Sequence, residues 1–380
     1  MDKGNSDNQI QERGKISAFQ LSLLVFTAVI STSDVFLPAF VAQEAKQDSW
    51  ISVLIGTALS LIVINVFLTL GLKYPNRTLI QYSSDIMGKL IGKLIGFLYI
   101  LYFLSIAFTV TRQMEELFVS DFNPNAPIIP FGLISVAVAA YALFHGLEVI
   151  ARVNEFLLPF GLLILLFIAI INIPNMDFNN FLPILYKGIY PVVKGGLLIQ
   201  GWVIEIIFLL QIIPFITNKN KIRKYISIST AALGISLETG VLVIAVFGPI
   251  TGKLIFPALN YIRFASLGPY IHNLDISILV VWIAGIFIKI SIFYYVSVHS
   301  ISQLFGFKSY KSTIVPVGVL LVLFSVISFK MLSQVLYFLH FIYPVCSFMM
   351  AFIIPCLLLF TSFIKDKLKG SGSKPKAKEC

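Results

Sequence analysis

The chain has 380 residues, of which 58% are hydrophobic and only 12% are charged, and its net charge is +10. Soluble domains are roughly 45–50% apolar and about 25% charged. A soluble fold of this length could not bury so much apolar surface, so the composition excludes an ordinary soluble protein and predicts that lipid is the solvent.

Ten stretches of the chain are long and apolar enough for transmembrane helices, each of which needs about 20 mostly apolar residues. They lie at 16–42, 50–72, 92–118, 128–145, 154–173, 191–214, 225–248, 275–304, 312–330 and 334–364. The predicted fold is therefore an all-α membrane protein with ten transmembrane helices over residues 16–364. Residues 1–15 are expected to form a cytoplasmic N-terminal segment, and the Lys-rich residues 365–380 a disordered basic cytoplasmic tail.

The basic residues predict the orientation. With the N-terminus inside, about 20 Lys and Arg residues fall on the inner side and about 7 on the outer side. This asymmetry favours a multi-pass protein of the cell membrane with both termini in the cytoplasm. It also explains the net charge without a nucleic-acid partner. The cluster 219–224 marks this topology or touches anionic membrane lipid, and the apolar outer loop 250–274 is expected to fold back over the outer face.

Polar residues interrupt the first predicted span. Ser31, Thr32, Ser33 and Asp34 follow one another, and Pro38 comes four residues after Asp34. Short polar side chains compete for backbone hydrogen bonds, and a proline removes the amide that would bond to the carbonyl four residues earlier. The sequence therefore predicts a break in this helix.

The sixth predicted span carries a similar signal. Gly195, Gly196 and Gly201 lower its helix stability by about 1 kcal/mol each, Glu205 needs a partner inside the membrane, and Pro214 closes the span. A second break is expected near residues 200–205.

Spans one and six open the two five-helix halves of the chain. Interrupted helices at corresponding positions of two halves are typical of 5+5 inverted-repeat transporters, whose substrate site lies at the midplane. The ends of the half-helices would offer amides and carbonyls to a zwitterion. The alternative is that the glycines only permit close helix packing.

Lys289 lies in the middle of the eighth span. A charged side chain at mid-bilayer costs at least about 2.5–3.5 kcal/mol on insertion scales, so it needs a partner. It forms a structural ion pair with Glu238, Glu205 or Asp34, or it acts as a fixed cation beside the site, replacing a coupling ion or holding a ligand carboxylate. Both alternatives stay open at this point.

Trp202, and Tyr102 with Ile106 one helical turn apart, could wall a small pocket, although single aromatic residues in such a chain usually pack in the core or face lipid. The four histidines are scattered, and the three cysteines form no metal spacing. No phosphate loop or nucleophile motif is present. The sequence therefore predicts neither an enzyme nor a metal or cofactor site.

Several segments resemble one family, the B subunits of endospore germinant receptors, which are related to amino acid–polyamine–organocation transporters. The resemblance covers most of residues 15–364. It is carried in order by KISAFQLSLLV, QDSWIS, GKLIGKLIGFLYILYFL, TRQMEEL, HGLEVIARVNE, FLPILYKGIYPVVKGGLL and EIIFLLQIIPF.

The resemblance implies a ten-helix inverted-repeat fold that recognises a germinant, usually an amino acid or another small nutrient. It also implies an A subunit and a lipoprotein C subunit as partners in the inner spore membrane. By similarity to the family's site, the ligand pocket would be lined by Ser31, Thr32, Ser33, Tyr102, Ile106, Gly201, Trp202, Glu205 and Lys289. Asp34 follows Ser33 directly, and it is predicted to contribute a carboxylate to the same pocket. One departure is that the family often has a glycine pair where this chain has Ser31 and Ser33.

Three functions follow from these features. The first is a receptor, in which ligand binding shifts the bundle between two states. The second is a proton-coupled permease for an amino acid or amine, with Asp34 or Glu205 as proton carrier and Lys289 in place of a coupling ion. The third is an interaction scaffold. The fold cannot choose between them, and the sequence favours the receptor through the resemblance.

Overall fold

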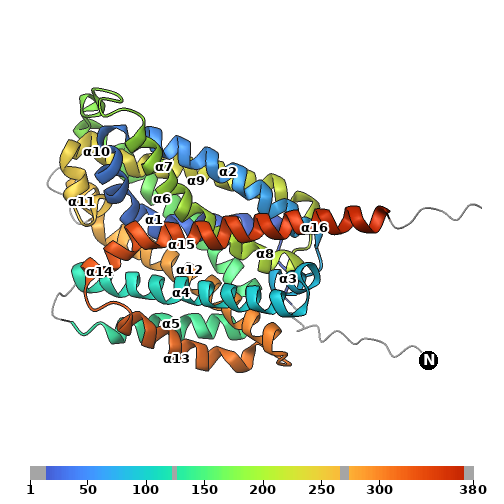
Figure 1. Cartoon of the computed structure of the whole chain (residues 1–380). Helices are drawn as coiled ribbons and strands as arrows, with labels where there is room; N and C mark the ends of the chain where they lie inside the picture. Colours follow the sequence, from blue (N-terminus) through green and yellow to red (C-terminus); the bar gives the residue numbers. More distant parts are fainter. Residues whose placement is uncertain (1–13, 122–125, 266–273, 372–380) are drawn as a thin grey trace, which may run out of the picture.

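The computed structural model describes residues 14–121, 126–265 and 274–371, and these residues form a bundle of long helices (Figure 1). The membrane-crossing helices of the first half are α1 (Ala18–Ala45), α2 (Ser49–Lys73), α4 (Lys89–Asp121), α5 (Ile129–His145) and α6 (Leu147–Asn172). The second half also has five crossings. The sixth is formed by α7 (Tyr190–Val203), η4 (Ile204–Phe208) and α8 (Leu209–Ile212), and the seventh by α9 (Ile222–Val241) and α10 (Val243–Phe247). The last three are α12 (Leu274–Phe305), α13 (Lys311–Ile327), and the continuous run of α14 (Leu332–Tyr337), α15 (Tyr343–Phe348) and α16 (Ile354–Ser371).

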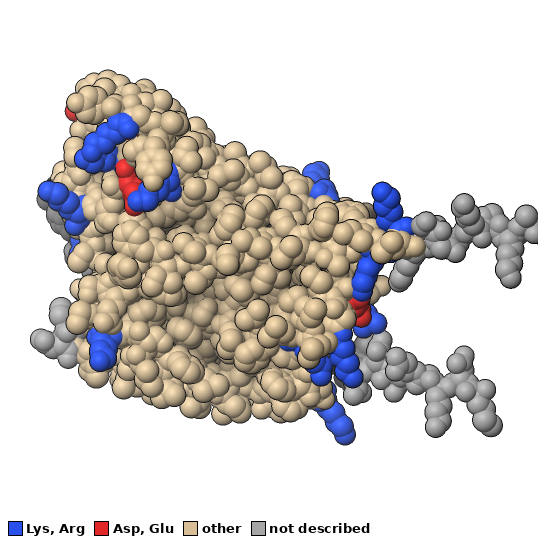
Figure 2. Space-filling view, viewed as in Figure 1, with Lys and Arg blue, Asp and Glu red and all other residues tan. Residues whose placement is uncertain are grey.

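The ten predicted crossings are all present in the described residues. Seven helical stretches are long and apolar enough to span a membrane, the first of which contains both α1 and α2, and the shorter apolar helices α5 and α13 complete the set. Figure 2 shows that the Lys and Arg side chains gather at the two ends of the molecule, with a wide uncharged belt between them. The all-α membrane fold is thus confirmed.

The predicted break in the first helix is wrong, because α1 runs unbroken from Ala18 to Ala45. The hydroxyl of Ser33 donates to the carbonyl of Val29 at 2.8 Å, which follows the helical path instead of competing with it. Pro38 frees only the carbonyl four residues earlier, and the helix continues through this point, where it packs against α7, α9 and α12.

The sixth crossing does change its geometry, at the position where a break was expected. The α-helix α7 ends at Val203, and the chain continues as the tighter 3₁₀ segment η4 before α8. A 3₁₀ stretch inside a helix often marks a functional hinge or strain. The helical path is not interrupted, but its side chains are redirected from Ile204 onward.

The start of the tail is helical, not disordered as predicted, because α16 extends to Ser371. Beyond the apolar region its polar turns are tied to neighbouring elements. Asp366 pairs with Lys73 at 2.6 Å, and the ammonium of Lys365 donates to the carbonyl of Asp85 at 3.2 Å. The tail beyond Ser371, like residues 1–13, lies outside the described residues.

The loop at 250–274, which is predicted to lie on the outer side, folds onto the bundle in its described part, in line with its apolar composition. Within it, η7 (Gly248–Lys253) and the short helix α11 (Pro257–Phe264) pack against α1. Leu259 and Ile262 are buried in this contact. Residues 266–273 of the loop lie outside the described part. On the opposite side of the belt, the short helix α3 (Leu79–Met87) packs along α4.

The close approach of α2 to α7 depends on glycine. A Cβ atom on Gly56 would lie 2.7 Å from the Cβ atom of Ile199 and 2.8 Å from the carbonyl oxygen of Gly196. Gly56→Val is therefore expected to destabilise the protein by about 1–3 kcal/mol through overpacking, measured as thermal unfolding in detergent. Ile62→Val, on the exposed side of α2, is the control, and an equal effect of both variants would contradict this account.

Candidate functional site

A buried ion pair lies at the centre of the bundle. The ammonium group of Lys289, on α12, donates to Glu205 Oε1 and, at 2.7 Å, to Thr32 Oγ1 of α1. The hydroxyl of Tyr343 donates to Glu205 Oε2 at 2.5 Å. Lys289 and Glu205 are each only 1% exposed. Of the partners considered for Lys289, the structure selects Glu205.

The change of helix type positions the acidic partner. Glu205 is the second residue of η4, where the helix tightens. Lys289 lies within the continuous helix α12, and Tyr343 begins α15, which follows the π-helical segment η8 (Phe338–Ile342). Single-turn π segments and short 3₁₀ segments are frequent at functional sites. One irregular segment thus carries the carboxylate of Glu205, and the other directly precedes Tyr343, which bonds to it.

These groups line a central cavity that is nearly closed. Its lining comprises Thr32, Ile106, Thr109, Val110, Gln113, Trp202, Glu205, Lys289, Leu339 and Tyr343. The volume that the centre of a water-sized sphere can occupy in this cavity is about 10 Å³. This is enough for about one water molecule. An amino acid therefore enters this cavity only if the surrounding helices move apart.

Trp202 forms one wall of the central cavity. Its side chain is 1% exposed and meets the ring of Tyr343 edge to face, with centroids 5.7 Å apart. The ring also lies 6.0 Å from the ammonium of Lys289, at the outer limit of a cation–π contact, and packs near Phe40. The predicted role of Trp202 as a pocket wall fits this placement.

The predicted site residues do not all meet here. The structure brings together Thr32, Ile106, Trp202, Glu205 and Lys289, which is half of the predicted set. Gly201 instead packs against α15, where an added Cβ would lie 2.8 Å from the Cβ of Pro344. The close-packing alternative therefore holds for Gly201.

Tyr102 and Ser33 do not line the central cavity. Tyr102 is buried beside Phe103, and the hydroxyl of Ser33 is used within α1 by its bond to Val29. The assignment of Ser33 to the pocket depended on a broken first helix, and α1 is continuous.

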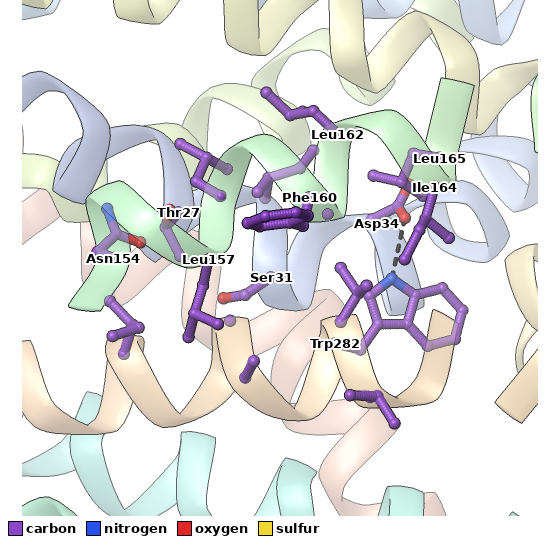
Figure 3. Close-up of a pocket in the computed structure, with 18 of the residues that line it drawn as sticks. Thr27, Ser31, Asp34, Asn154, Leu157, Phe160, Leu162, Ile164, Leu165 and Trp282 are labelled. Carbon is purple, nitrogen blue, oxygen red and sulfur yellow. Dashed lines mark hydrogen bonds between the residues drawn. The ribbon is translucent and has the colours of Figure 1, made fainter. Parts of the chain in front are cut away.

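Ser31 and Asp34 face a second, larger cavity, on the other side of α1 (Figure 3). This cavity lies between α1, α6 and α12. The volume that the centre of a water-sized sphere can occupy in it is about 180 Å³. Asp34 Oδ2 accepts a hydrogen bond from the indole nitrogen of Trp282 at 3.1 Å. An ordinary helix turns by about 100° per residue, so Ser31 and Thr32 point to different sides of an unbroken α1.

Several lining residues of these cavities are not among the predicted ones, and three of them are important for the contacts described above. Tyr343 bonds the central carboxylate, Trp282 bonds Asp34, and Asn154 lines the second cavity. Asn154 carried a usable signal, since it is a polar residue at the start of an apolar span. Tyr343 and Trp282 carried none, because aromatic residues are common throughout this chain.

This fold and its central pair of buried charges define a multi-pass membrane protein of the transporter-like, all-α class. Residues 15–331 match the family model described as spore germination protein, and the chain belongs to that family.

Named relatives agree with this assignment. The chain is similar to spore germination protein KB of Bacillus subtilis (strain 168), with 28% identity over 323 residues, which is 83% of this chain and 85% of the relative. It is also similar to spore germination protein YndE of the same organism, with 29% identity covering 77% and 82%. Spore germination protein A2, again from this organism, is 26% identical over 95% and 99% of the two chains.

Two solved transporters share the fold. MhsT in complex with L-phenylalanine superposes with a TM-score of 0.65 at 13% identity, covering 92% of this chain and 89% of that one. Mhp1, a nucleobase-cation-symport-1 family transporter in a closed conformation with bromovinylhydantoin bound, gives a TM-score of 0.59 at 14% identity, covering 88% and 77%. These similarities establish the architecture, and the chemistry of this chain follows from its own residues.

Proposed function

We propose that this protein senses a small nutrient germinant, in the first place an amino acid, at the central cavity. Membership of the spore germination family supplies the biological role. The observation that carries the ligand class is the ion pair between Lys289 and Glu205, which places one cation and one anion side by side in a buried cavity.

An amino acid can replace this pair without leaving a charge unpaired. Its carboxylate would form an ion pair with the ammonium of Lys289, and its ammonium would form an ion pair with the carboxylate of Glu205. Removing one partner of a buried pair is strongly destabilising, so a ligand with only one charge would leave the other protein charge without a partner. Thr32 and Tyr343, which already bond to the pair, would remain as hydrogen-bonding groups beside the ligand.

Sensing follows if the ligand prefers the opened cavity. A ligand shifts a conformational equilibrium only by its difference in affinity between the two states. The closed cavity has the room of about one water molecule, so an amino acid binds the opened state almost exclusively. Separation of α7 and η4 from α12 would then be the movement that partner subunits detect.

The test compares zwitterions with singly charged derivatives. Spores that carry this gene as their only receptor of its type are scored for germination with a panel of L-amino acids. For each active amino acid, the N-acetyl derivative and the methyl ester are then compared. We expect both derivatives to lose activity, because each leaves one charge of the central pair unsatisfied. Full activity of either derivative would contradict the two-charge mode of recognition.

The permease alternative is an outcome of a parallel measurement. Purified protein in liposomes is given the same labelled amino acid with and without a proton gradient. Binding without concentrative uptake supports the receptor function. Robust gradient-driven uptake by this chain alone would favour the permease.

The partners and the location are part of the proposal. The family resemblance supports an A subunit, a lipoprotein C subunit and residence in the inner spore membrane, and the excess of basic residues on one side supports cytoplasmic termini. Co-purification of an affinity-tagged chain from spore membranes tests the assembly, and recovery without both subunits would contradict it.

A further inference from the structure

The cavity between α1, α6 and α12 is here called the outer cavity, because it opens at the lipid-facing surface of the bundle. It is separate from the central cavity, and α1 and α12 form the wall between the two. On α1, Ser31 lines the outer cavity and Thr32 the central one. On α12, Ile288 lines the outer cavity and Lys289 the central one. The two cavities therefore present different chemical groups to their contents.

The outer cavity contains buried polar groups that have no hydrogen-bond partner among the described residues. They are Thr27 Oγ1, Ser31 Oγ and both polar atoms of the Asn154 amide. Their side chains are no more than 4% exposed, and Figure 3 shows Thr27 and Ser31 on α1 and Asn154 on the neighbouring helix α6. Buried polar groups without partners are rare in folded proteins, and each calls for an explanation.

Asp34 lies at one end of this row. Its carboxylate is 7% exposed and accepts one hydrogen bond, from the neutral indole of Trp282. Within the described residues no Lys, Arg or His forms an ion pair with it. A buried carboxylate without a cation is costly, and an ammonium group from a ligand would supply the missing partner.

Apart from Asn154, the wall that α6 contributes to the outer cavity is apolar. Leu157, Leu158, Leu165 and Phe160 of α6 form most of it (Figure 3). Phe160 is 54% exposed and Val280, across the opening, is 61% exposed, so the cavity opens toward the lipid-facing side of the bundle. Apolar compounds dissolved in the membrane therefore have direct access to it.

We propose that this outer cavity binds a small primary amine with an apolar body, with its ammonium at Asp34 and its body against the leucines of α6. A zwitterion does not fit this cavity, because its lining residues include no basic side chain to receive a carboxylate. The volume of about 180 Å³ suits a compact ring or a short branched chain. Thr27 lies about 10 Å along α1 from Asp34, at seven residues and 1.5 Å per residue. Thr27, together with Asn154 of α6, which lines the same cavity, can receive a polar substituent.

The test uses 2-phenylethylamine and its neutral counterpart ethylbenzene with the purified full-length protein in detergent micelles. Binding is measured by calorimetric titration and by the shift in thermal unfolding. We expect the amine to bind the wild-type protein and ethylbenzene to bind at least about tenfold more weakly, since a hydrogen bond to a charged group is lost. Asp34→Asn should weaken amine binding by a similar factor and leave ethylbenzene unaffected.

Two further variants separate this cavity from the central one. Thr27→Leu adds bulk to the outer cavity and breaks no hydrogen bond seen in the structure, so it should reduce amine binding even if Asp34→Asn does not fold. The double variant Lys289→Met/Glu205→Gln removes both members of the central ion pair together, which is often neutral for stability. It changes only the central cavity and should preserve amine binding.

Three results would overturn the proposal. They are no amine binding by the wild-type protein at millimolar concentration, equal affinity for the amine and ethylbenzene, and loss of amine binding in a folded Lys289→Met/Glu205→Gln variant but not in Asp34→Asn. The last result would assign the amine to the central cavity, and the proposed recognition of amino acids there would be tested separately by the germination assay.

Discussion

Lys289→Met is expected to destabilise the folded protein by about 3–5 kcal/mol, because it leaves the buried carboxylate of Glu205 without its cation. Both side chains are almost fully buried, so water cannot compensate for the lost partner. The free energy of unfolding of the purified protein, measured in detergent, gives the size of the effect. Lys308→Met, on an exposed residue just beyond α12, is the matched control and should have little effect.

The double variant Lys289→Met/Glu205→Gln separates stability from recognition. Replacing a whole buried ion pair is often neutral or even stabilising, so much of the lost stability should return. The germination response to an amino acid should remain absent, because neither ligand charge has a partner. A double variant that is stable and responds at the wild-type dose would contradict the central recognition site.

Trp202→Ala is expected to cost about 3–5 kcal/mol, the usual range for removing a large buried aromatic side chain. It also enlarges the central cavity beside Tyr343 and Lys289, which contact this ring. We therefore expect the range of active amino acids to shift toward larger side chains, as measured by germination against a panel of graded size.

Trp202→Phe provides the comparison, because it keeps an aromatic wall and removes less volume. It should retain the wild-type preference with a smaller loss of stability. If Trp202→Ala left the dose response of every amino acid unchanged while the protein remained folded, this residue would not belong to the ligand site.

Hydropathy alone was sufficient for the course of the chain through the membrane, because the length of an apolar run is set by bilayer thickness. It was not sufficient for the shape of α1. The Ser31–Asp34 run indicated a break, but the bond from Ser33 to Val29 and the packing of α7, α9 and α12 around the helix keep it continuous. Such tertiary contacts override local helix preferences.

The candidate site was predictable only in part, for a related reason. Lys289 and Glu205 were evident because charges inside a span need partners. Their pairing, and the bond from Tyr343, join residues 84 and 138 positions apart, and no local pattern encodes such a meeting. A broken helix would let Ser31, Thr32 and Asp34 line one pocket. In the continuous helix α1, Ser31 and Asp34 line the cavity beside α6, and Thr32 lines the central cavity.

The shared wall of α1 and α12 has a thermodynamic consequence. A displacement of this wall changes the free energy of occupancy on both sides at once, because Ser31 and Ile288 move together with Thr32 and Lys289. Linkage between two sites is reciprocal. If the two cavities bind their proposed ligands, the factor by which the amine changes the affinity for an amino acid equals the factor by which the amino acid changes the affinity for the amine. Germination would then depend on the concentrations of both compounds together.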